Sequence, residues 1–309
     1  MAVTTHPARA SLTALGTSLM RAHHTRSARE PLIDDPWGER LVSDPERATL
    51  REVLLSGLDA QAREPLNALD PDELLGVLLR SHTSYGTVII RTRYTEDALA
   101  ATVACGVRQF VIIGAGMDSF ALRRPPFASE VEVFEIDHPA TQELKLRRFA
   151  DRGLGLPRGV HFVAADLGVE GIDDALAGST FDAARPSFFS WLGVTPYLTR
   201  AANLKTLRAI ASCGTRGSQL VFDFHDQREY DTPPSDEGAA RVRAQLARVG
   251  EAWRSGFHPS ELGGDLRAVG LELIEDLSPD DLRVRYCAGS EDALVPSTSH
   301  HIARARVAA

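Results

Sequence analysis

The sequence feature that most constrains the fold is a change of rhythm near residue 109, where short apolar runs begin to alternate with helix-length segments. Five such runs follow one another: Gln109–Ile113, Glu132–Ile136, Gly159–Ala164, Ser187–Trp191 and Gln219–Phe224. This pattern is typical of a parallel sheet built from βαβ units. Two later runs, Leu271–Asp276 and His301–Val307, would add strands at one edge. The sequence therefore predicts an α/β fold with a doubly wound, seven-stranded, mostly parallel sheet.

The first 100 residues show helical patterns and no strand pattern. Ser11–His24 is amphipathic, and Pro71–Arg80 begins with acidic residues, which stabilise the N-terminus of a helix. Pro36–Leu41 follows an Asp-Asp-Pro sequence that indicates a further helix start. We therefore expect residues 1–100 to form a helical cap.

The expected core covers residues 101–309 and contains one interruption. Between Asp226 and Pro259, a cluster of turn-forming residues and a charged helix over Glu237–Val249 break the sheet pattern. We interpret residues 226–259 as an insertion that forms, together with the N-terminal cap, the lid of a binding pocket.

Net charge and cysteine content limit the classes of binding partner and the cellular compartment that we expect. A net charge of −8 gives no general attraction to polyanions, so neither nucleic acid nor an anionic membrane is expected as a partner. The three cysteines, Cys105, Cys213 and Cys287, lack metal or disulfide spacing, which is typical of reduced thiols. Neither a signal peptide nor about 18 consecutive apolar residues occur. We expect a cytoplasmic monomer or homodimer whose partner is a small molecule.

A glycine pair follows the first expected strand directly, at Gly114 and Gly116. Glycines lack the β-carbons that would block a ligand, and ligands in open α/β sheets bind at the carboxyl ends of strands. A dinucleotide fingerprint would have a third glycine at position 119, whereas this chain has Ser119. The motif favours a ligand loop other than a nicotinamide site, with a tight turn that binds nothing as the alternative.

Acidic residues end the next two expected strands. Asp137 lies about 20 residues beyond the glycine pair, where a carboxylate can accept hydrogen bonds from ribose hydroxyls. Glu135 could point to the same side, because side chains alternate along a strand, but Asp137 is the preferred contact. Asp166 can accept from the exocyclic amine of adenine, while the N–H of Leu167 can donate to a ring nitrogen. For Asp166 the alternative is an ordinary helix cap.

Two arginines, Arg91 and Arg93, precede the first expected strand and flank Thr92. Because they cannot both lie on the same helical face, we expect at least one to point toward the crevice. A ligand carboxylate there would need a bidentate cationic partner. The ligand that unites the glycines, the two aspartates and this arginine is S-adenosylmethionine.

These motifs resemble the leucine carboxyl methyltransferase family, in particular its bacterial branch that includes the tetracenomycin polyketide O-methyltransferase. The resemblance covers nearly the whole chain and rests on Arg21-Ala22-His23, Pro31-Leu32-Ile33-Asp34-Asp35-Pro36, Arg91-Thr92-Arg93, Gly114-Ala115-Gly116-Met117-Asp118, Phe134-Glu135-Ile136-Asp137-His138-Pro139, Asp166-Leu167 and Gly193-Val194-Thr195-Pro196-Tyr197-Leu198. It implies a Rossmann-like class I methyltransferase core with an added N-terminal helical segment. It also assigns to the cofactor Arg91 or Arg93, Gly114, Asp137, Asp166 and Leu167.

One departure from the family concerns the residue before the Gly-Val-Thr segment, where many relatives carry a glutamate and this chain has Leu192. A leucine cannot accept a hydrogen bond or stabilise a cation. We therefore expect an apolar wall around Trp191, Leu192 and Tyr197 to face the methyl acceptor. The departure also leaves open a protein that binds the cofactor without catalysis.

Methyl transfer from a sulfonium depends mainly on alignment and on exclusion of water. A carboxylate acceptor is ionised at neutral pH, whereas a phenol would benefit from a base, for which His225 and His258 are the candidates. Apart from His23-His24 and His300-His301, no residues stand at metal-ligand spacing, so no metal is expected.

The leading hypothesis is an O-methyltransferase that acts on a carboxyl or phenolic hydroxyl of a small, polyketide-like metabolite, with a role in secondary metabolism. A nicotinamide-dependent oxidoreductase and a non-catalytic cofactor-binding protein are the alternatives.

Overall fold

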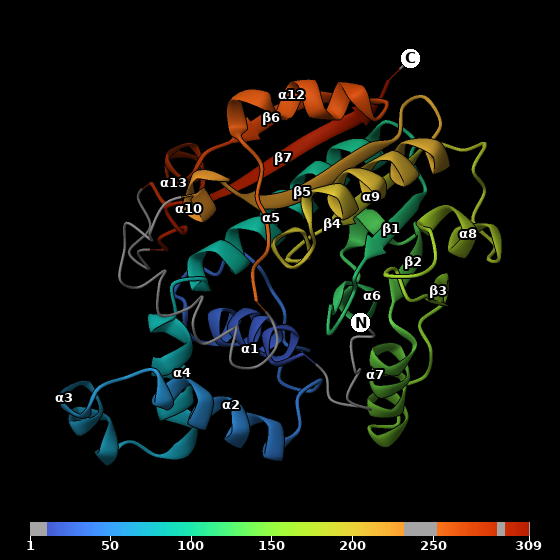
Figure 1. Cartoon of the computed structure of the whole chain (residues 1–309). Coiled ribbons are helices and arrows are strands. Elements are labelled where there is room, and N and C mark those ends of the chain that lie inside the picture. The colour runs from blue at the N-terminus through green and yellow to red at the C-terminus, as the bar shows by residue number, and fades with distance from the viewer. Residues whose placement is uncertain (1–10, 232–251, 289–293, 309) are drawn as a thin grey trace.

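The computed structural model describes residues 11–231, 252–288 and 294–308, which form one seven-stranded sheet with helices on both faces (Figure 1). The strand order is β3-β2-β1-β4-β5-β7-β6. β1 to β5 are parallel, and β7 runs antiparallel to both β5 and β6. The bounds are β1 Gln109–Ile113, β2 Glu132–Asp137, β3 Val160–Ala164, β4 Ser187–Trp191, β5 Gln219–His225, β6 Leu271–Leu277 and β7 His300–Val307. The predicted doubly wound sheet is confirmed, because each strand begins and ends within one residue of its expected bounds.

Twelve described α-helices surround the sheet. They are α1 Leu12–Ser27, α2 Asp44–Ser56, α3 Ala60–Arg63, α4 Pro71–Ser81, α5 Tyr85–Ala104, α6 Phe120–Arg123, α7 Pro139–Asp151, α8 Ile172–Ala177, α9 Arg200–Cys213, α10 Arg228–Asp231, α12 Pro259–Ala268 and α13 Pro279–Tyr286. Short 3-10 turns cover Glu64–Ala68, Pro126–Ala128 and Thr195–Tyr197. The helix expected over Glu237–Val249 lies outside the described residues.

Local sequence explains where the N-terminal helices begin. Ser11 caps α1 by accepting the N–H of Ala14 at 3.3 Å, and the Asp70 carboxylate caps α4 by accepting the N–H groups of Asp72 and Glu73. Residues 36–41 form turns instead of the expected helix.

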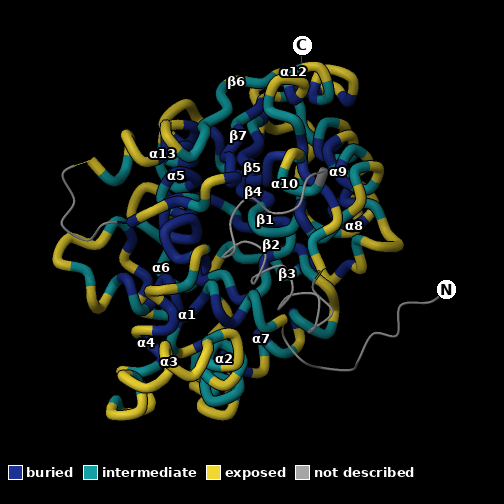
Figure 2. The backbone as a smooth tube through the Cα atoms, turned by 60° about the vertical axis from the view of Figure 1, so that its left-hand side comes forward, coloured by how far each residue is buried: buried dark blue, intermediate teal, exposed yellow. Residues whose placement is uncertain are grey.

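Two hydrophobic cores lie on opposite faces of the sheet, because side chains alternate along each strand. Phe110 and Ile112 of β1 face the core that includes α1, α4 and α5, whereas Val111 and Ile113 face the core formed with α8, α9 and α12. Figure 2 shows β1, β4 and β5 as a buried centre and α3 as an exposed element at the periphery. The sheet is therefore covered on both faces, as its near-continuous apolar runs require.

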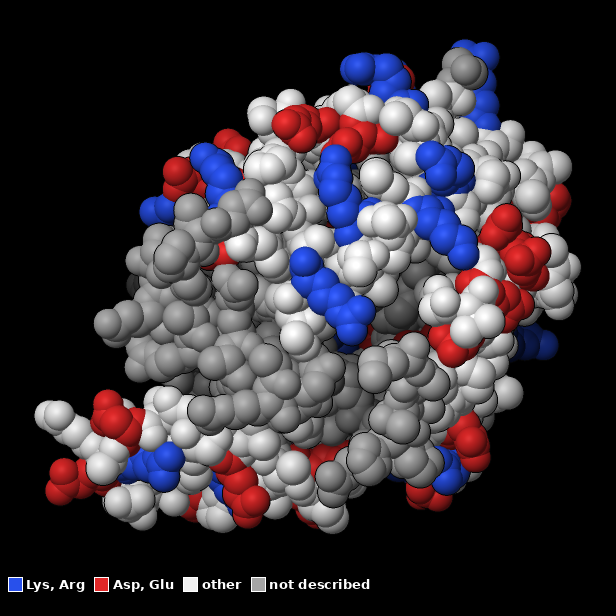
Figure 3. Space-filling view, viewed as in Figure 1, with Lys and Arg blue, Asp and Glu red and all other residues white. Residues whose placement is uncertain are grey.

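The N-terminal segment differs from a separate cap, because its last helix is part of the core. α5 packs against β4 and β5 and extends past residue 100, where the cap was expected to end. Among the residues that the structure describes, none of the helices combines the length and apolar character that a membrane span requires. On the face seen in Figure 3, the described basic and acidic side chains are interspersed.

Candidate functional site

The candidate site is a pocket of about 370 Å³ at the carboxyl ends of β3, β2, β1 and β4. Strand order reverses between β1 and β4, which is the position where open α/β sheets bind their ligands. Three inter-strand spacings of about 4.8 Å separate β3 from β4, so this row of strand ends extends over about 14 Å. Residues of α1, including Ala14, Thr17 and Arg21, and Arg91 of α5 also line the pocket.

Gly114 and Gly116 form the turn that follows β1 and line the pocket. Their φ angles of +70° and +50° lie in the left-handed region, which favours glycine. A Cβ on Gly114 would also lie 2.7 Å from Cγ2 of Val194, closer than carbon atoms approach. The N–H groups of Gly114 and Ala115 donate to the Ile136 carbonyl at 2.9 and 3.1 Å, so the loop is tied to β2.

Asp137 ends β2 and lines the pocket, whereas Glu135 does not. The Asp137 carboxylate accepts the N–H of Gly116 and, at 2.6 Å, its neighbour His138 N–H. Burial raises the pKa of Asp137, against these two N–H groups, which favour the charged form. Glu135 is 1% exposed and pairs with Nζ of Lys145 at 2.5 Å. Of the two acids, the structure brings only Asp137 to the pocket.

Asp166 and Leu167 follow β3 and line the other end of the pocket. The Asp166 carboxylate is exposed and accepts the Gly168 N–H at 2.9 Å, so it forms a local turn as well as facing the pocket. The backbone before it is fixed by the Ala165 N–H, which donates to the Asp137 carbonyl at 2.9 Å. Both expected adenine contacts are thus placed two strands away from the glycine loop.

The two arginines expected near the site lie in different places. Arg91 lines the pocket, and its Nη1 lies 2.7 Å from Oδ2 of Asp223. Arg93 is outside the lining, where its Nε pairs with Asp97 at 2.8 Å and its Nη1 donates to the Leu32 carbonyl at 3.1 Å. The helical offset between them makes Arg91 the arginine that can reach a ligand.

Asp223 of β5 is a site residue that the sequence analysis missed. It is 1% exposed and accepts from Arg91 and from the Gly193 N–H, the latter at 2.6 Å. Burial opposes its ionisation, but the Arg91 charge and these hydrogen bonds outweigh burial and lower the pKa of the carboxyl. Gly193 has φ of +68°, and a Cβ there would lie 2.8 Å from Nη2 of Arg91. The signal that could have found Asp223 is an acid between two phenylalanines in a buried strand.

The expected acceptor wall is only partly at the pocket. Leu192 and Tyr197 line it, whereas Trp191 is 0% exposed and packs with Phe222 in the opposite core. Trp191 was placed on the wrong face, because alternation along β4 turns it away from its neighbour Leu192.

The two histidines expected as bases lie outside the lining. His225 is buried at the end of β5, with Nδ1 3.0 Å from Oγ of Ser299 and its ring beside Trp253. His258 is half-buried at the start of α12. Among the described lining residues the one imidazole is His138, beside Asp137. In the described part of the chain, no three His, Cys, Asp or Glu side chains are grouped so that they could hold a metal ion.

The pocket residues fit S-adenosylmethionine in their chemistry. A carboxylate has about four acceptor sites, and the Gly116 and His138 N–H groups occupy two at Asp137, which leaves acceptors for ribose hydroxyls. Arg91 supplies a guanidinium for a carboxylate, and the glycine turn lets a ligand approach the backbone. A pocket of this volume lies within the range of about 300–1,000 Å³ found for small-molecule sites.

Comparisons with known proteins agree with this fit. The family model of leucine carboxyl methyltransferase matches residues 14–211. YktD of Bacillus subtilis, named an S-adenosyl-L-methionine-dependent methyltransferase, is 31% identical over 94% of this chain and 96% of its own. A Mycobacterium tuberculosis protein with the same kind of name is 33% identical over 78% of this chain and 74% of its own.

Two solved structures share the fold. A DUF574 family protein from Streptomyces avermitilis has a TM-score of 0.55 and 14% identity, covering 94% of this chain and 97% of that one. A structure from Thermobifida fusca, described as a methyltransferase, also has a TM-score of 0.55, with 17% identity over 84% of this chain and 93% of that one.

Proposed function

Because the chain belongs to the leucine carboxyl methyltransferase family and is an S-adenosylmethionine-dependent methyltransferase, we propose that it methylates an oxygen atom of a small metabolite, a carboxylate or a phenolic hydroxyl. The observation that carries this proposal is the position of Leu192, which lines the same pocket as Gly114 and Asp137. An apolar side chain thus stands at the end of β4, where it can strip water from an oxyanion and raise its reactivity.

On the cofactor side, each strand end has a separate binding task. Asp137 accepts from the ribose hydroxyls, Asp166 and the Leu167 N–H bind adenine, and Arg91 binds the methionyl carboxylate. Gly114 gives the ligand access to the backbone. S-adenosylmethionine supplies, when bound, a methyl group on a positively charged sulfur.

On the acceptor side, Leu192 and Tyr197 form the wall against which the metabolite binds. Ala14 and Thr17 of α1 also line the pocket, and Ala14 lies beside Gly116 of the glycine loop. Asp223 offers no free charge to an amine, because Arg91 and the Gly193 N–H already engage it. At the end of the pocket beside Leu192, an anionic acceptor oxygen therefore meets no unpaired carboxylate from Asp223. The helical segment acts as a lid that keeps water out.

The position of the histidines favours an acceptor that is ionised without help. His225 and His258 lie outside the pocket lining, and His138 lies at β2, about 10 Å from the end of β4 by two strand spacings. A carboxylate needs no general base at neutral pH. Family membership leaves no support for the nicotinamide-dependent oxidoreductase considered above.

A pH profile tests which acceptor class is used. For methyl transfer to a carboxylic acid, kcat/KM should be flat between about pH 6 and 9, because the acceptor is ionised throughout. For the matching phenol it should rise toward the phenol pKa near 10. If kcat/KM for the carboxylic acid instead fell as the pH dropped through a single pKa near 6.5, an essential imidazole would be indicated, which would contradict the proposal.

A further inference from the structure

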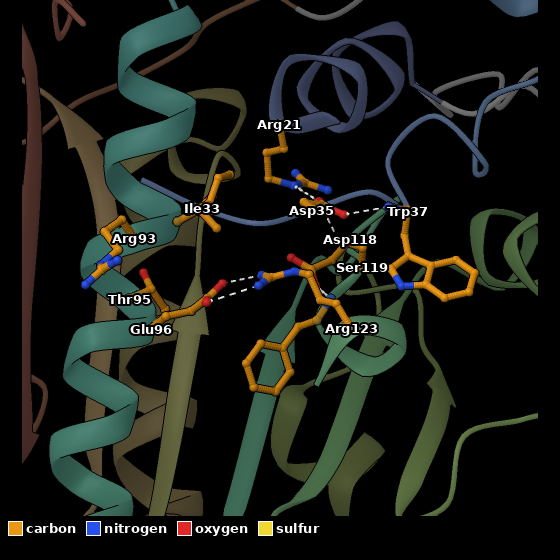
Figure 4. Close-up of polar contacts among 12 residues, drawn as sticks. Arg21, Ile33, Asp35, Trp37, Arg93, Thr95, Glu96, Asp118, Ser119 and Arg123 are labelled. Carbon is orange, nitrogen blue, oxygen red and sulfur yellow. Dashed lines mark hydrogen bonds and ion pairs between the residues drawn. The ribbon is translucent and has the colours of Figure 1, made fainter. Parts of the chain in front are cut away.

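Asp35 lies at the centre of a buried polar network that the catalytic proposal does not use (Figure 4). Its carboxylate is 0% exposed and is engaged on both oxygens. Oδ1 accepts the N–H groups of Trp37 and Gly38 at 3.1 and 3.2 Å. Oδ2 accepts from Nε of Arg21 at 2.8 Å and from Oγ of Ser119 at 2.5 Å.

Two of these partners connect Asp35 to the loop that carries the glycine pair. Ser119 is 1% exposed and lies three residues after Gly116. Arg21, held by Asp35, donates from Nη2 to the Met117 carbonyl at 3.0 Å. The N-terminal segment therefore contacts the loop at two points, the hydroxyl of Ser119 and the backbone carbonyl of Met117.

A second ion pair holds the other end of the same loop. Arg123, at the end of α6, pairs with Glu96 of α5, as Figure 4 shows. Burial opposes the ionisation of Asp35, but the charges of Arg21 and Arg123 outweigh it and lower the pKa of the carboxyl. Asp35 is therefore a carboxylate at neutral pH and can accept all four hydrogen bonds.

We propose that Asp35 is a positioning residue that holds the glycine loop in its cofactor-binding conformation through Ser119 and Arg21. Ser119 occupies the place where a dinucleotide fingerprint would have a glycine, and here its hydroxyl joins the loop to the N-terminal segment. Gly116 has φ of +50°, which is one of many conformations that glycine adopts without strain, so contacts from the surrounding structure are needed to select it. The inference rests on the cofactor site described above.

The experiment compares Asp35→Asn with Asp34→Asn. Asp34 is the exposed neighbour of Asp35, so the control makes the same change of charge one residue away. An amide at position 35 turns an acceptor oxygen into a donor that faces Arg21 or Ser119. Calorimetry with S-adenosylhomocysteine, at a temperature where every variant is folded, measures cofactor-site affinity, and a thermal scan measures stability separately.

We expect Asp35→Asn to bind S-adenosylhomocysteine about ten- to hundredfold more weakly than the wild type, and Asp34→Asn to bind as the wild type does. A residue with only a structural role would lower the thermal midpoint and leave the affinity of the folded protein unchanged, and that result would overturn the proposal. Failure of the wild type to bind would instead refute the cofactor assignment.

Ser119→Ala removes the same contact from the loop side. If Asp35→Asn does not fold, this variant alone tests whether the contact positions the loop. It should also weaken binding, and the double variant should lose less affinity than the two single losses combined, because both remove one hydrogen bond. Unchanged affinity in folded Ser119→Ala, or fully additive losses, would show that the contact does not position the loop.

Discussion

The guanidinium of Arg91 and the buried carboxylate of Asp223 form an ion pair, with Nη1 2.7 Å from Oδ2, that joins α5 to β5 beside the pocket. Asp223 also accepts the N–H of Gly193, so one carboxylate orients both the arginine and the turn after β4. The cation that we assign to the methionyl carboxylate is therefore held by the fold before a ligand arrives. Such preorganisation reduces the cost of ordering the site on binding.

Replacing Arg91 with lysine should weaken S-adenosylhomocysteine binding by about 1–3 kcal/mol, because a lysine keeps the charge and loses the forked donor geometry. Arg93→Lys is the matched control, since Arg93 pairs with Asp97 outside the lining. Calorimetry on both variants measures the difference. Equal losses in the two variants would mean that Arg91 has no special contact with the ligand.

Asp137→Asn should weaken cofactor binding by about 1–3 kcal/mol, because it replaces a ribose acceptor with a donor. Glu135→Gln should instead leave affinity intact and lower the unfolding midpoint in urea, since it leaves buried Lys145 without its counter-charge. The crossed pattern of affinity and stability is the readout. A reversed pattern would move the ribose contact to Glu135.

The ion pair at Asp223 predicts a pH dependence of stability. Because its folded-state pKa is lowered, its stabilisation is fully present above the unfolded-state value of about 3.9 and is lost as the pH falls through the folded-state value. Asp223→Asn should cost about 3 kcal/mol, a gap that stays constant from about pH 8 to 5 and narrows below about pH 4. Urea unfolding at several pH values measures it, and a gap that widens in acid would contradict the assignment.

Leu192→Glu should lower turnover at least about tenfold, because a carboxylate would repel an anionic acceptor oxygen. Cofactor affinity should stay nearly unchanged, since Leu192 is assigned to the acceptor side. Leu192→Met is the control, because it keeps an apolar side chain of similar volume. If Leu192→Glu raises turnover, the proposed electrostatics of the acceptor wall are wrong.

The sheet and the glycine loop could be predicted from sequence because they depend on local patterns. Short, mostly apolar runs that are buried on both faces, such as Gln109–Ile113 and Ser187–Trp191, predict strands from their own residues alone. Asp137 follows from its place at a strand end after the glycines. These signals need only the residue and its neighbours along the chain.

The network around Asp35 could not be predicted, because its partner Ser119 lies 84 positions away and each residue alone has an ordinary local use. Asp35 looked like part of a helix start, whereas its carboxylate caps a turn and binds the loop. Asp223 differs, because an acid between two phenylalanines in a buried strand was a local signal, although its partner Arg91 lies on another element. Trp191 was misplaced because it was assigned to one wall with its neighbour Leu192, although successive side chains along a strand face opposite sides.

The proposed reaction moves a methyl group from S-adenosylmethionine to an oxygen of a small acceptor, so the atom that carries the transferred carbon decides whether this reaction occurs. The wild type is incubated with S-adenosylmethionine labelled in its methyl group, a panel of carboxylic acids and phenols with matched amines, and EDTA. We predict an O-methyl product, identified by NMR and mass spectrometry, at a rate that EDTA does not change. Label found on nitrogen, or transfer abolished by EDTA, would contradict metal-independent methylation of oxygen.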